Sequence, residues 1–145
     1  MNIISNASIT LVVQWSNFGP FHLARLNNTY ELLKPKGINI VGMEMASKKK
    51  LFAWEQNDRA LFTRYVVFPG RIYESVSPIK MFTGVFTALN RIKPDIVAVN
   101  GYSSCDAWGA LIWCKLHNKP AILMSDSNAD DITRYYWKEW VKRLF

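Results

Sequence analysis

The sequence predicts an α/β domain with a mostly parallel sheet and helices on both of its faces. Short, continuously apolar runs recur along the chain, and they alternate with longer stretches in which apolar residues follow helical spacing. Strands that alternate with helices indicate βαβ units, and strands that are buried on both faces have no polar side. Of the 145 residues, 50% are hydrophobic and 20% are charged, so the composition is that of one packed domain.

The first half of the chain contains three predicted strands and one predicted helix. The strands are β-rich apolar runs at residues 9–15, 38–45 and 63–68. The helix spans residues 20–34, because Pro20 suits its first position and Pro35 and Gly37 stop it. Pro69-Gly70 is expected to end the third strand.

The segment between the second and third strands combines charge with apolar side chains. The basic run 48–50 leads directly into Leu51, Phe52 and Trp54. We interpret the segment as an excursion from the sheet that suits an anionic membrane surface. The alternative is a solvated run of charge.

The second half of the chain contains two further strands, at residues 95–99 and 121–124, and helices around them. Ser77-Pro78 is an N-cap followed by proline at the first helical position. The apolar positions that follow have the spacing of one helix face: Ile79, Phe82, Val85, Phe86, Leu89 and Ile92. A helix over residues 105–117 is apolar nearly all round and is therefore expected to be deeply buried.

A last helix is predicted from about residue 131 to Phe145, and it carries no stop signal. Its apolar positions continue to the final residue, with no terminal glycine or asparagine. We therefore expect residues 1–145 to form one domain of a longer protein, with the remainder of the protein following it.

Right-handed crossovers restrict how these elements can be arranged. The commonest arrangement has strand order 3-2-1-4-5, a Rossmann-like three-layer domain whose ligand crevice lies where strands one and four part. Three loops are expected to meet there, at residues 16–22, 100–105 and 125–131. We interpret these loops as the candidate site.

The first of these loops contributes Gly19, His22 and Arg25. His22 and Arg25 lie one turn apart on roughly the same face of the predicted helix, beside the expected crevice. Imidazole and guanidinium groups there can bind a hydroxyl-rich or anionic ligand. The alternative is that His22 caps the helix and Arg25 is solvated.

The other two loops contribute polar side chains that follow strands four and five. Asn100, Gly101 and Tyr102 can approach a sugar through hydroxyl and amide groups and through the bare backbone at the glycine. Asp126 and Ser127 can orient an acceptor hydroxyl, and Asp126 can act as a base. The alternatives are an ordinary polar turn and the capping of the following helices.

Several classes of function are excluded or left open. The sequence has neither a GxGxxG nor a GxxxxGK[ST] fingerprint and no GxSxG elbow, which argues against dinucleotide-dependent dehydrogenases, P-loop enzymes and serine hydrolases. No Cys/His cluster suggests a metal site.

The net charge of +7 favours phosphates, anionic lipid or nucleic acid, but no nucleic-acid-binding motif is present, so we expect no nucleic-acid partner. His117, near a helix end, suits a helix-dipole role better than catalysis.

The two cysteines and the hydropathy indicate a compartment. Cys105 and Cys114 are nine residues apart in one apolar helix, so they face opposite sides and are expected to be buried free thiols, as suits a reducing cytosol. No apolar run reaches the length of a membrane span. We expect a cytoplasmic protein with peripheral contact to the inner face of the membrane.

The order of these pieces resembles the N-terminal domain of family 4 glycosyltransferases, which have the two-domain GT-B fold. The resemblance spans nearly the whole chain. The residues that carry it are Asn17-Phe-Gly-Pro-Phe-His-Leu-Ala-Arg-Leu26, Lys93-Pro-Asp-Ile-Val-Ala-Val99 and Lys119-Pro-Ala-Ile-Leu-Met-Ser-Asp126. The first run is the most specific of the three.

The resemblance implies an enzyme that moves a sugar from a nucleotide-sugar donor to a saccharide or lipid-linked acceptor, without metal or other cofactor. This domain would hold the acceptor, and a C-terminal domain would hold most of the nucleotide. Family members often carry a histidine just after the fifth strand, where this chain has Asp126. The alternative function is a non-catalytic Rossmann-like module that binds a small ligand or an acidic partner.

Overall fold

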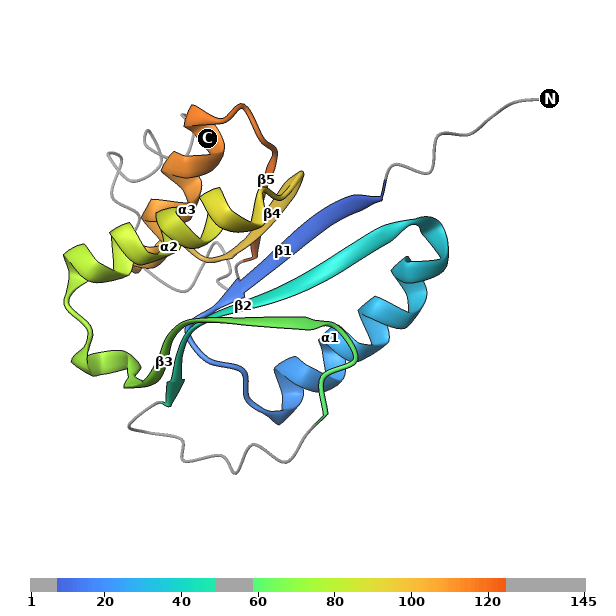
Figure 1. Ribbon diagram of the computed structural model, residues 1–145, viewed down its shortest axis with the longest axis horizontal. Helices are drawn as coiled ribbons and strands as arrows, with labels where there is room; N and C mark the ends of the chain where they lie inside the picture. The colour runs from blue at the N-terminus through green and yellow to red at the C-terminus, as the bar shows by residue number, and fades with distance from the viewer. Residues whose placement is uncertain (1–7, 49–58, 125–145) are drawn as a thin grey trace, which may run out of the picture.

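A computed structural model describes residues 8–48 and 59–124 as a five-stranded sheet covered by helices on both faces (Figure 1). The strand order is β3-β2-β1-β4-β5, and each pair of neighbouring strands is parallel. The predicted fold class and strand order are therefore confirmed. The elements in chain order are β1 (Ile9–Trp15), α1 (Pro20–Leu33), β2 (Ile38–Lys48), β3 (Thr63–Ile72), α2 (Pro78–Ile92), β4 (Ile96–Asn100), α3 (Cys105–Leu116) and β5 (Ala121–Met124), with short 3-10 turns at Lys34–Lys36 and Tyr73–Ser75.

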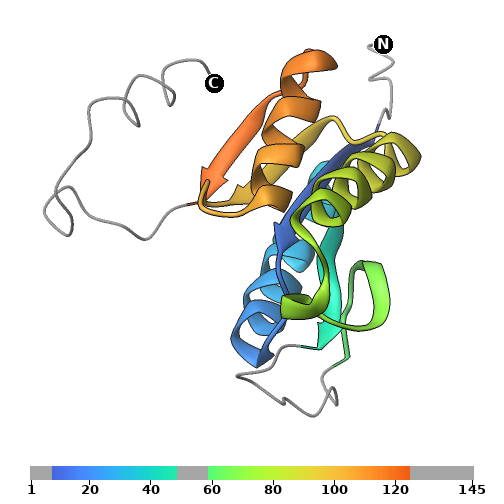
Figure 2. The same cartoon turned by 90° about the vertical axis from the view of Figure 1, so that its left-hand side faces the viewer.

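Two separate apolar cores lie on the two faces of the sheet, one under α1 and one under α2 and α3, the helices that Figure 2 shows around the strands. The core on the α1 face is built around Phe18, Leu23 and Ile40. The larger core lies under α2 and α3, where the buried side chains of Leu89, Val99 and Trp113 pack together. Successive residues of a strand point to opposite faces, so each core takes alternate residues of the same strands.

The third strand is longer than predicted. β3 continues through Pro69 and Gly70 to Ile72, and β2 extends to Lys48. The reason is that β3 is an edge strand of the described sheet, where a proline without an N–H group breaks no ladder. The pairing register also shifts between Ala46 and Lys48, which accommodates the irregular backbone.

Two predictions about helix faces were wrong. Cys105 is exposed, because it occupies the first position of α3, where the helix emerges from its loop, whereas Cys114 is buried as predicted. On α2, the side chain of Ile79 is 77% exposed and Met81 is buried in its place. The predicted excursion, apart from Lys48, and the predicted last helix lie outside the described residues. No helix within residues 8–48 and 59–124 has the length and hydrophobicity needed to cross a membrane.

Asp95 joins the start of β4 to the start of β1. Its carboxylate accepts hydrogen bonds from the backbone N–H of Thr10 at 2.9 Å and from the ammonium of Lys119 at 3.2 Å. The bond from Thr10 is the main reason that the pKa of Asp95 lies below its ordinary value, and Lys119 adds to the effect. The ionised carboxylate is therefore the form that the fold prefers.

The depressed pKa of Asp95 predicts how stability depends on pH. A group with a lowered folded-state pKa stabilises the fold above its unfolded pKa, about 3.9 for aspartate, and this stabilisation is lost as the pH falls through the folded-state value. The stability of Asp95→Asn should therefore fall less than that of wild type as the pH is lowered through this range, with stability measured as the urea midpoint. Lys119→Met should flatten it less, because Thr10 still donates. An equal fall of the urea midpoint at low pH in wild type and in Asp95→Asn would contradict this assignment.

Gly109 lets α3 approach α2 closely. A Cβ atom at this position would lie 2.5 Å from Cγ1 of Val85 and 3.1 Å from the backbone oxygen of Phe82. Helix propensity alone would make Gly109→Ala stabilising by up to about 1 kcal/mol. We predict instead a loss of about 1–3 kcal/mol in the free energy of unfolding, because the added methyl overpacks the interface between the helices. Chemical denaturation decides between the two signs.

Candidate functional site

The candidate site lies at the carboxyl edge of the sheet, where β1 and β4 are neighbours. Leu11, Val12 and Val13 of β1 pair with Ile96, Val97 and Ala98 of β4 in parallel register. The helices that follow the two strands then leave to opposite faces, α1 to one and α3 to the other (Figure 1). We call this place the switch point, since it is where ligands bind in open α/β sheets.

The loop from β1 to α1 places His22 beside Trp15. Gly19 is the N-cap residue of α1, and its backbone N–H donates to Nδ1 of His22 at 3.2 Å. The imidazole ring lies 4.7 Å from the Trp15 ring, centroid to centroid. His22 thus caps the helix, as the simpler alternative proposed, and the contact requires a lone pair on Nδ1. Arg25, one turn later, is exposed.

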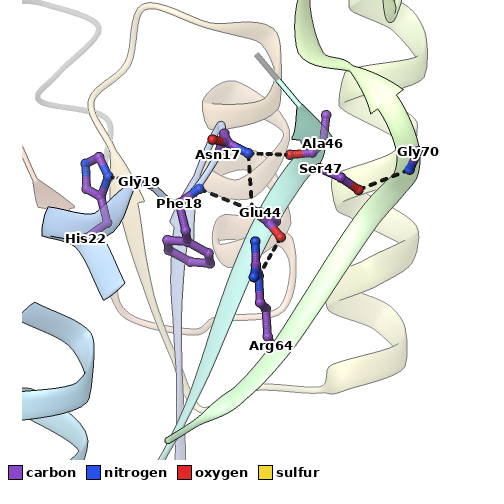
Figure 3. Close-up of polar contacts among 9 residues, drawn as sticks. All are labelled: Asn17, Phe18, Gly19, His22, Glu44, Ala46, Ser47, Arg64 and Gly70. Carbon is purple, nitrogen blue, oxygen red and sulfur yellow. Dashed lines mark hydrogen bonds and ion pairs between the residues drawn. The ribbon is translucent and has the colours of Figure 1, made fainter. Parts of the chain in front are cut away.

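A buried carboxylate, which the sequence reasoning missed, fixes this loop. Glu44 on β2 is fully buried, and its Oε2 accepts from the backbone N–H of Phe18 at 3.1 Å (Figure 3). Oε1 accepts from Nε of Arg64 on β3 at 2.7 Å. Nδ2 of Asn17 lies 3.5 Å from Oε2 and donates more closely, at 3.0 Å, to the carbonyl of Ala46. The carboxylate therefore ties the loop to two strands at once.

Arg64 contacts the ring of Phe18 as well as the carboxylate of Glu44. Its guanidinium carbon lies 6.0 Å from the centre of the Phe18 ring, a distance compatible with a cation–π contact. Its Nη2 atom is buried and has no partner among the described residues. The sequence did contain a signal for this contact: Glu44 is a lone charge inside an apolar strand, and a buried charge needs a partner.

A second polar cluster lies on the opposite face of the sheet, under α3. Nε2 of Gln14 donates to Oδ2 of Asp106 at 2.9 Å, and the hydroxyl of Tyr73 donates to Oδ1 of the same carboxylate at 2.9 Å. Gln14 and Asp106 are both buried. The pKa of Tyr73 is raised above its ordinary value by burial first and by the negative charge of Asp106 second. This cluster was not predicted from the sequence.

The loop from β4 to α3 borders this second cluster. Asn100 ends β4 and is exposed, whereas Gly101 and Tyr102 are half-buried. Gly101 has a φ of +69°, in the region that glycine adopts without strain, and its N–H donates to the carbonyl of Met124 on β5 at 2.8 Å. Among the described residues, no atom lies within 4 Å of where a Cβ would be added to Gly101.

The structure brings only some of the predicted site residues to one place. The loops that carry Gly19 and His22 and that carry Asn100 to Tyr102 leave neighbouring parallel strands at the same edge. Asp126 and Ser127 lie outside the described residues, so their part in the site stays a prediction. His117 is at the C-terminus of α3, at the opposite edge of the sheet, and its ring stacks on Trp113 at 4.3 Å.

The two clusters offer different chemistry on the two sides of the switch point. The α1 side carries the His22 imidazole and the exposed Arg25, which suit anionic groups and hydroxyl oxygens, beside the Arg64–Glu44 ion pair. The α3 side presents a carboxylate and an amide, which suit hydrogen-bond donors. Among residues 8–48 and 59–124, no group of His, Cys, Asp and Glu side chains is placed to hold a metal ion.

Comparison with known proteins adds information about the fold. No protein-family model matches the sequence, and no curated protein matches it. Among solved structures, the chain is similar to one assigned as a UDP-N-acetylglucosamine 2-epimerase from Listeria monocytogenes, with a TM-score of 0.51 and 13% sequence identity. The match covers 81% of this chain and 31% of that protein, so the chain spans about a third of that protein's length. At this identity the likeness shows a shared Rossmann-like fold.

The Glu44 contact predicts a large stability change for a nearly isosteric substitution. Glu44→Gln keeps the shape of the side chain but leaves the Arg64 guanidinium without its counter-charge, and breaking a buried ion pair costs about 3 kcal/mol or more. We expect such a loss in the free energy of unfolding measured with urea. The matched control is Glu31→Gln on the exposed face of α1, which should change stability by no more than about 0.5 kcal/mol. Equal effects of the two substitutions would contradict the assigned role of Glu44.

Proposed function

We propose that this chain is the acceptor-side domain of a glycosyltransferase that uses a nucleotide-sugar donor. The observation that carries the proposal is the switch point itself, where the loop that carries His22 and the polar loop that contains Gly101 leave neighbouring parallel strands at the same edge of the sheet. The sequence resemblance to family 4 glycosyltransferases supports it. The fold similarity to a protein assigned as acting on a UDP-sugar supports the coarser statement, that the chain belongs to a sugar-processing enzyme.

In this proposal each loop has a distinct role. His22 and Arg25 bind the acceptor or the adjacent phosphates from the α1 side, and Gly19 allows close approach of the backbone at the start of that helix. Asn100, Gly101 and Tyr102 bind saccharide hydroxyls from the α3 side. The proposal also assigns Asp126 as the base that accepts the proton of the acceptor hydroxyl, with Ser127 beside it.

A second candidate reaction is favoured by one observation. The similar solved structure is assigned as an epimerase of UDP-N-acetylglucosamine, so a chain with this fold can belong to an enzyme that rearranges the sugar without transferring it. The two reactions differ in what they release. Transfer liberates a nucleoside diphosphate for every sugar moved, whereas epimerisation leaves the nucleotide sugar intact with one stereocentre inverted.

A donor screen on the full-length protein tests the proposal. The protein is incubated with a panel of nucleotide sugars, including UDP-N-acetylglucosamine, with and without saccharide acceptors. We expect release of nucleoside diphosphate that depends on the acceptor and persists in EDTA, because the resemblance implies a metal-independent enzyme. Epimer formation, followed by proton NMR, would favour the second reaction.

Loss of His22 provides the matched variant for this screen. His22→Ala should raise the KM for the acceptor or lower kcat by about tenfold or more, as expected when a positioned hydrogen-bonding group is lost. Thr29→Ala is the control. Thr29 lies on the same helix, seven residues after His22, and its loss should leave both constants near wild type. If the full-length protein neither binds nor consumes any nucleotide sugar, the proposed function is wrong and the binding-module alternative takes its place.

A further inference from the structure

An unpartnered acceptor lies inside the cluster on the α3 side of the switch point. Gln14 is 1% exposed, and its Nε2 donates to Asp106. Its Oε1 is also buried, yet none of the described residues donates a hydrogen bond to it. Buried amide oxygens nearly always have a partner, so the missing donor needs an explanation.

The orientation of this amide is fixed by its neighbours. If the carboxamide of Gln14 were turned over, its oxygen would face Oδ2 of Asp106 at hydrogen-bond distance, and two acceptors would repel each other. Asp106 cannot turn away freely, because Tyr73 donates to its other oxygen at 2.9 Å. Oε1 of Gln14 is therefore held as an acceptor and not as part of a freely rotating side chain.

The charges around Oε1 select the chemical class of its partner. The partner must carry a hydrogen to donate, which a fully ionised phosphate does not. The carboxylate of Asp106 accepts a hydrogen bond from the same amide, and its negative charge would also repel an anion. The loop beside the cluster contains the half-buried Tyr102 and Gly101, where no atom of the described residues would contact an added Cβ. A neutral hydroxyl fits these conditions.

We propose that Oε1 of Gln14 is a saccharide subsite, where it accepts a hydrogen bond from a sugar hydroxyl, with Asp106 and Tyr73 holding the amide in place. The proposal rests on the proposed function, since it assumes that the switch point binds sugars. It assigns the sugar ring to the α3 side and leaves the basic α1 side to anionic groups. Because Oε1 is buried in this structure, the proposal requires the side chains around it to shift when the hydroxyl binds.

The hydroxyl can belong to the donor sugar or to the acceptor, and calorimetry on the full-length protein separates the two. Wild type and Gln14→Met are titrated with UDP-N-acetylglucosamine, with UDP and with free N-acetylglucosamine. We expect Gln14→Met to weaken binding of the sugar-bearing probe by about tenfold, which corresponds to about 1.4 kcal/mol. UDP binding should not change. A loss for UDP-N-acetylglucosamine assigns the donor sugar, and a loss for free N-acetylglucosamine alone assigns the acceptor.

A stability control separates this effect from damage to the fold. Gln14→Met also deprives Asp106 of a hydrogen-bond donor, so a control is needed that removes a side-chain hydrogen bond elsewhere. Asn90→Leu serves as this control, because it removes the acceptor of the Trp113 ring N–H in the α2–α3 layer, away from the switch point. It should leave all three affinities near wild type. If Gln14→Met does not fold, the ¹³C resonance of the Gln14 carboxamide in wild type gives a second measurement, and it should shift with the sugar-bearing probe but not with UDP.

The outcomes are distinguishable. Equal affinities of wild type and Gln14→Met for both sugar-bearing probes, or a Gln14 carboxamide resonance that does not move, would overturn the saccharide subsite and leave a buried water as the partner of Oε1. The proposed function would survive that result. If wild type binds neither UDP-N-acetylglucosamine nor N-acetylglucosamine, the subsite is overturned together with the use of this sugar.

Discussion

The ion pair between Glu44 and Arg64 is the contact on which the geometry of the candidate site depends. A carboxylate that is fully buried must recover its lost hydration from hydrogen bonds, and Glu44 does so with a guanidinium, a backbone N–H and an amide. The backbone N–H belongs to Phe18, in the loop that leads to Gly19 and His22. The same charge therefore joins β2 to the edge strand β3 and fixes the start of α1. Without this ion pair, fewer contacts would hold the loop that positions the capping contact of His22.

The alternation of side chains along β1 divides the site into two halves. Val13 and Trp15 point toward the α1 face, where Trp15 contacts His22, whereas Gln14 points to the α3 face, where it meets Asp106. Neighbouring positions on one strand thus support an imidazole on one side and a carboxylate–amide pair on the other. A ligand with both an anionic group and hydroxyls, such as a sugar phosphate, matches this division. That match is the physical basis for proposing a sugar-nucleotide enzyme.

The sheet could be predicted from the sequence because its signals are local. Each strand is a short apolar run between turn residues, and the strand order follows from crossover handedness, so no long-range contact had to be known. The extension of β3 through Pro69 was missed because proline usually ends a strand, and its tolerance here depends on the strand being at an edge. Exposed Cys105 and Ile79 were missed for a related reason: apolar character does not show where a helix passes the rim of the sheet.

The polar clusters were much harder to predict than the sheet. Gln14 and Glu44 each appear in the sequence as one polar residue within an apolar run, Asp106 follows two serines and a cysteine, and each partner is far away along the chain. Gln14 meets a residue 92 positions later, and Glu44 meets one 20 positions later. Only the fold reveals such pairs. The placement of His22 next to the switch point was predictable, and its capping role was one of the two alternatives, but its ring contact with Trp15 was not foreseen and the role of Asp126 stays a prediction.

We propose that this protein binds a sugar-containing ligand at the switch point between β1 and β4. A crystal structure of the full-length protein with UDP-N-acetylglucosamine tests it most directly. We expect ligand density at the carboxyl ends of β1 and β4, with a hydroxyl near Oε1 of Gln14 and anionic groups on the His22 side. Ligand density at the opposite edge of the sheet, near His117, or density that touches neither loop of the switch point would contradict this proposed site.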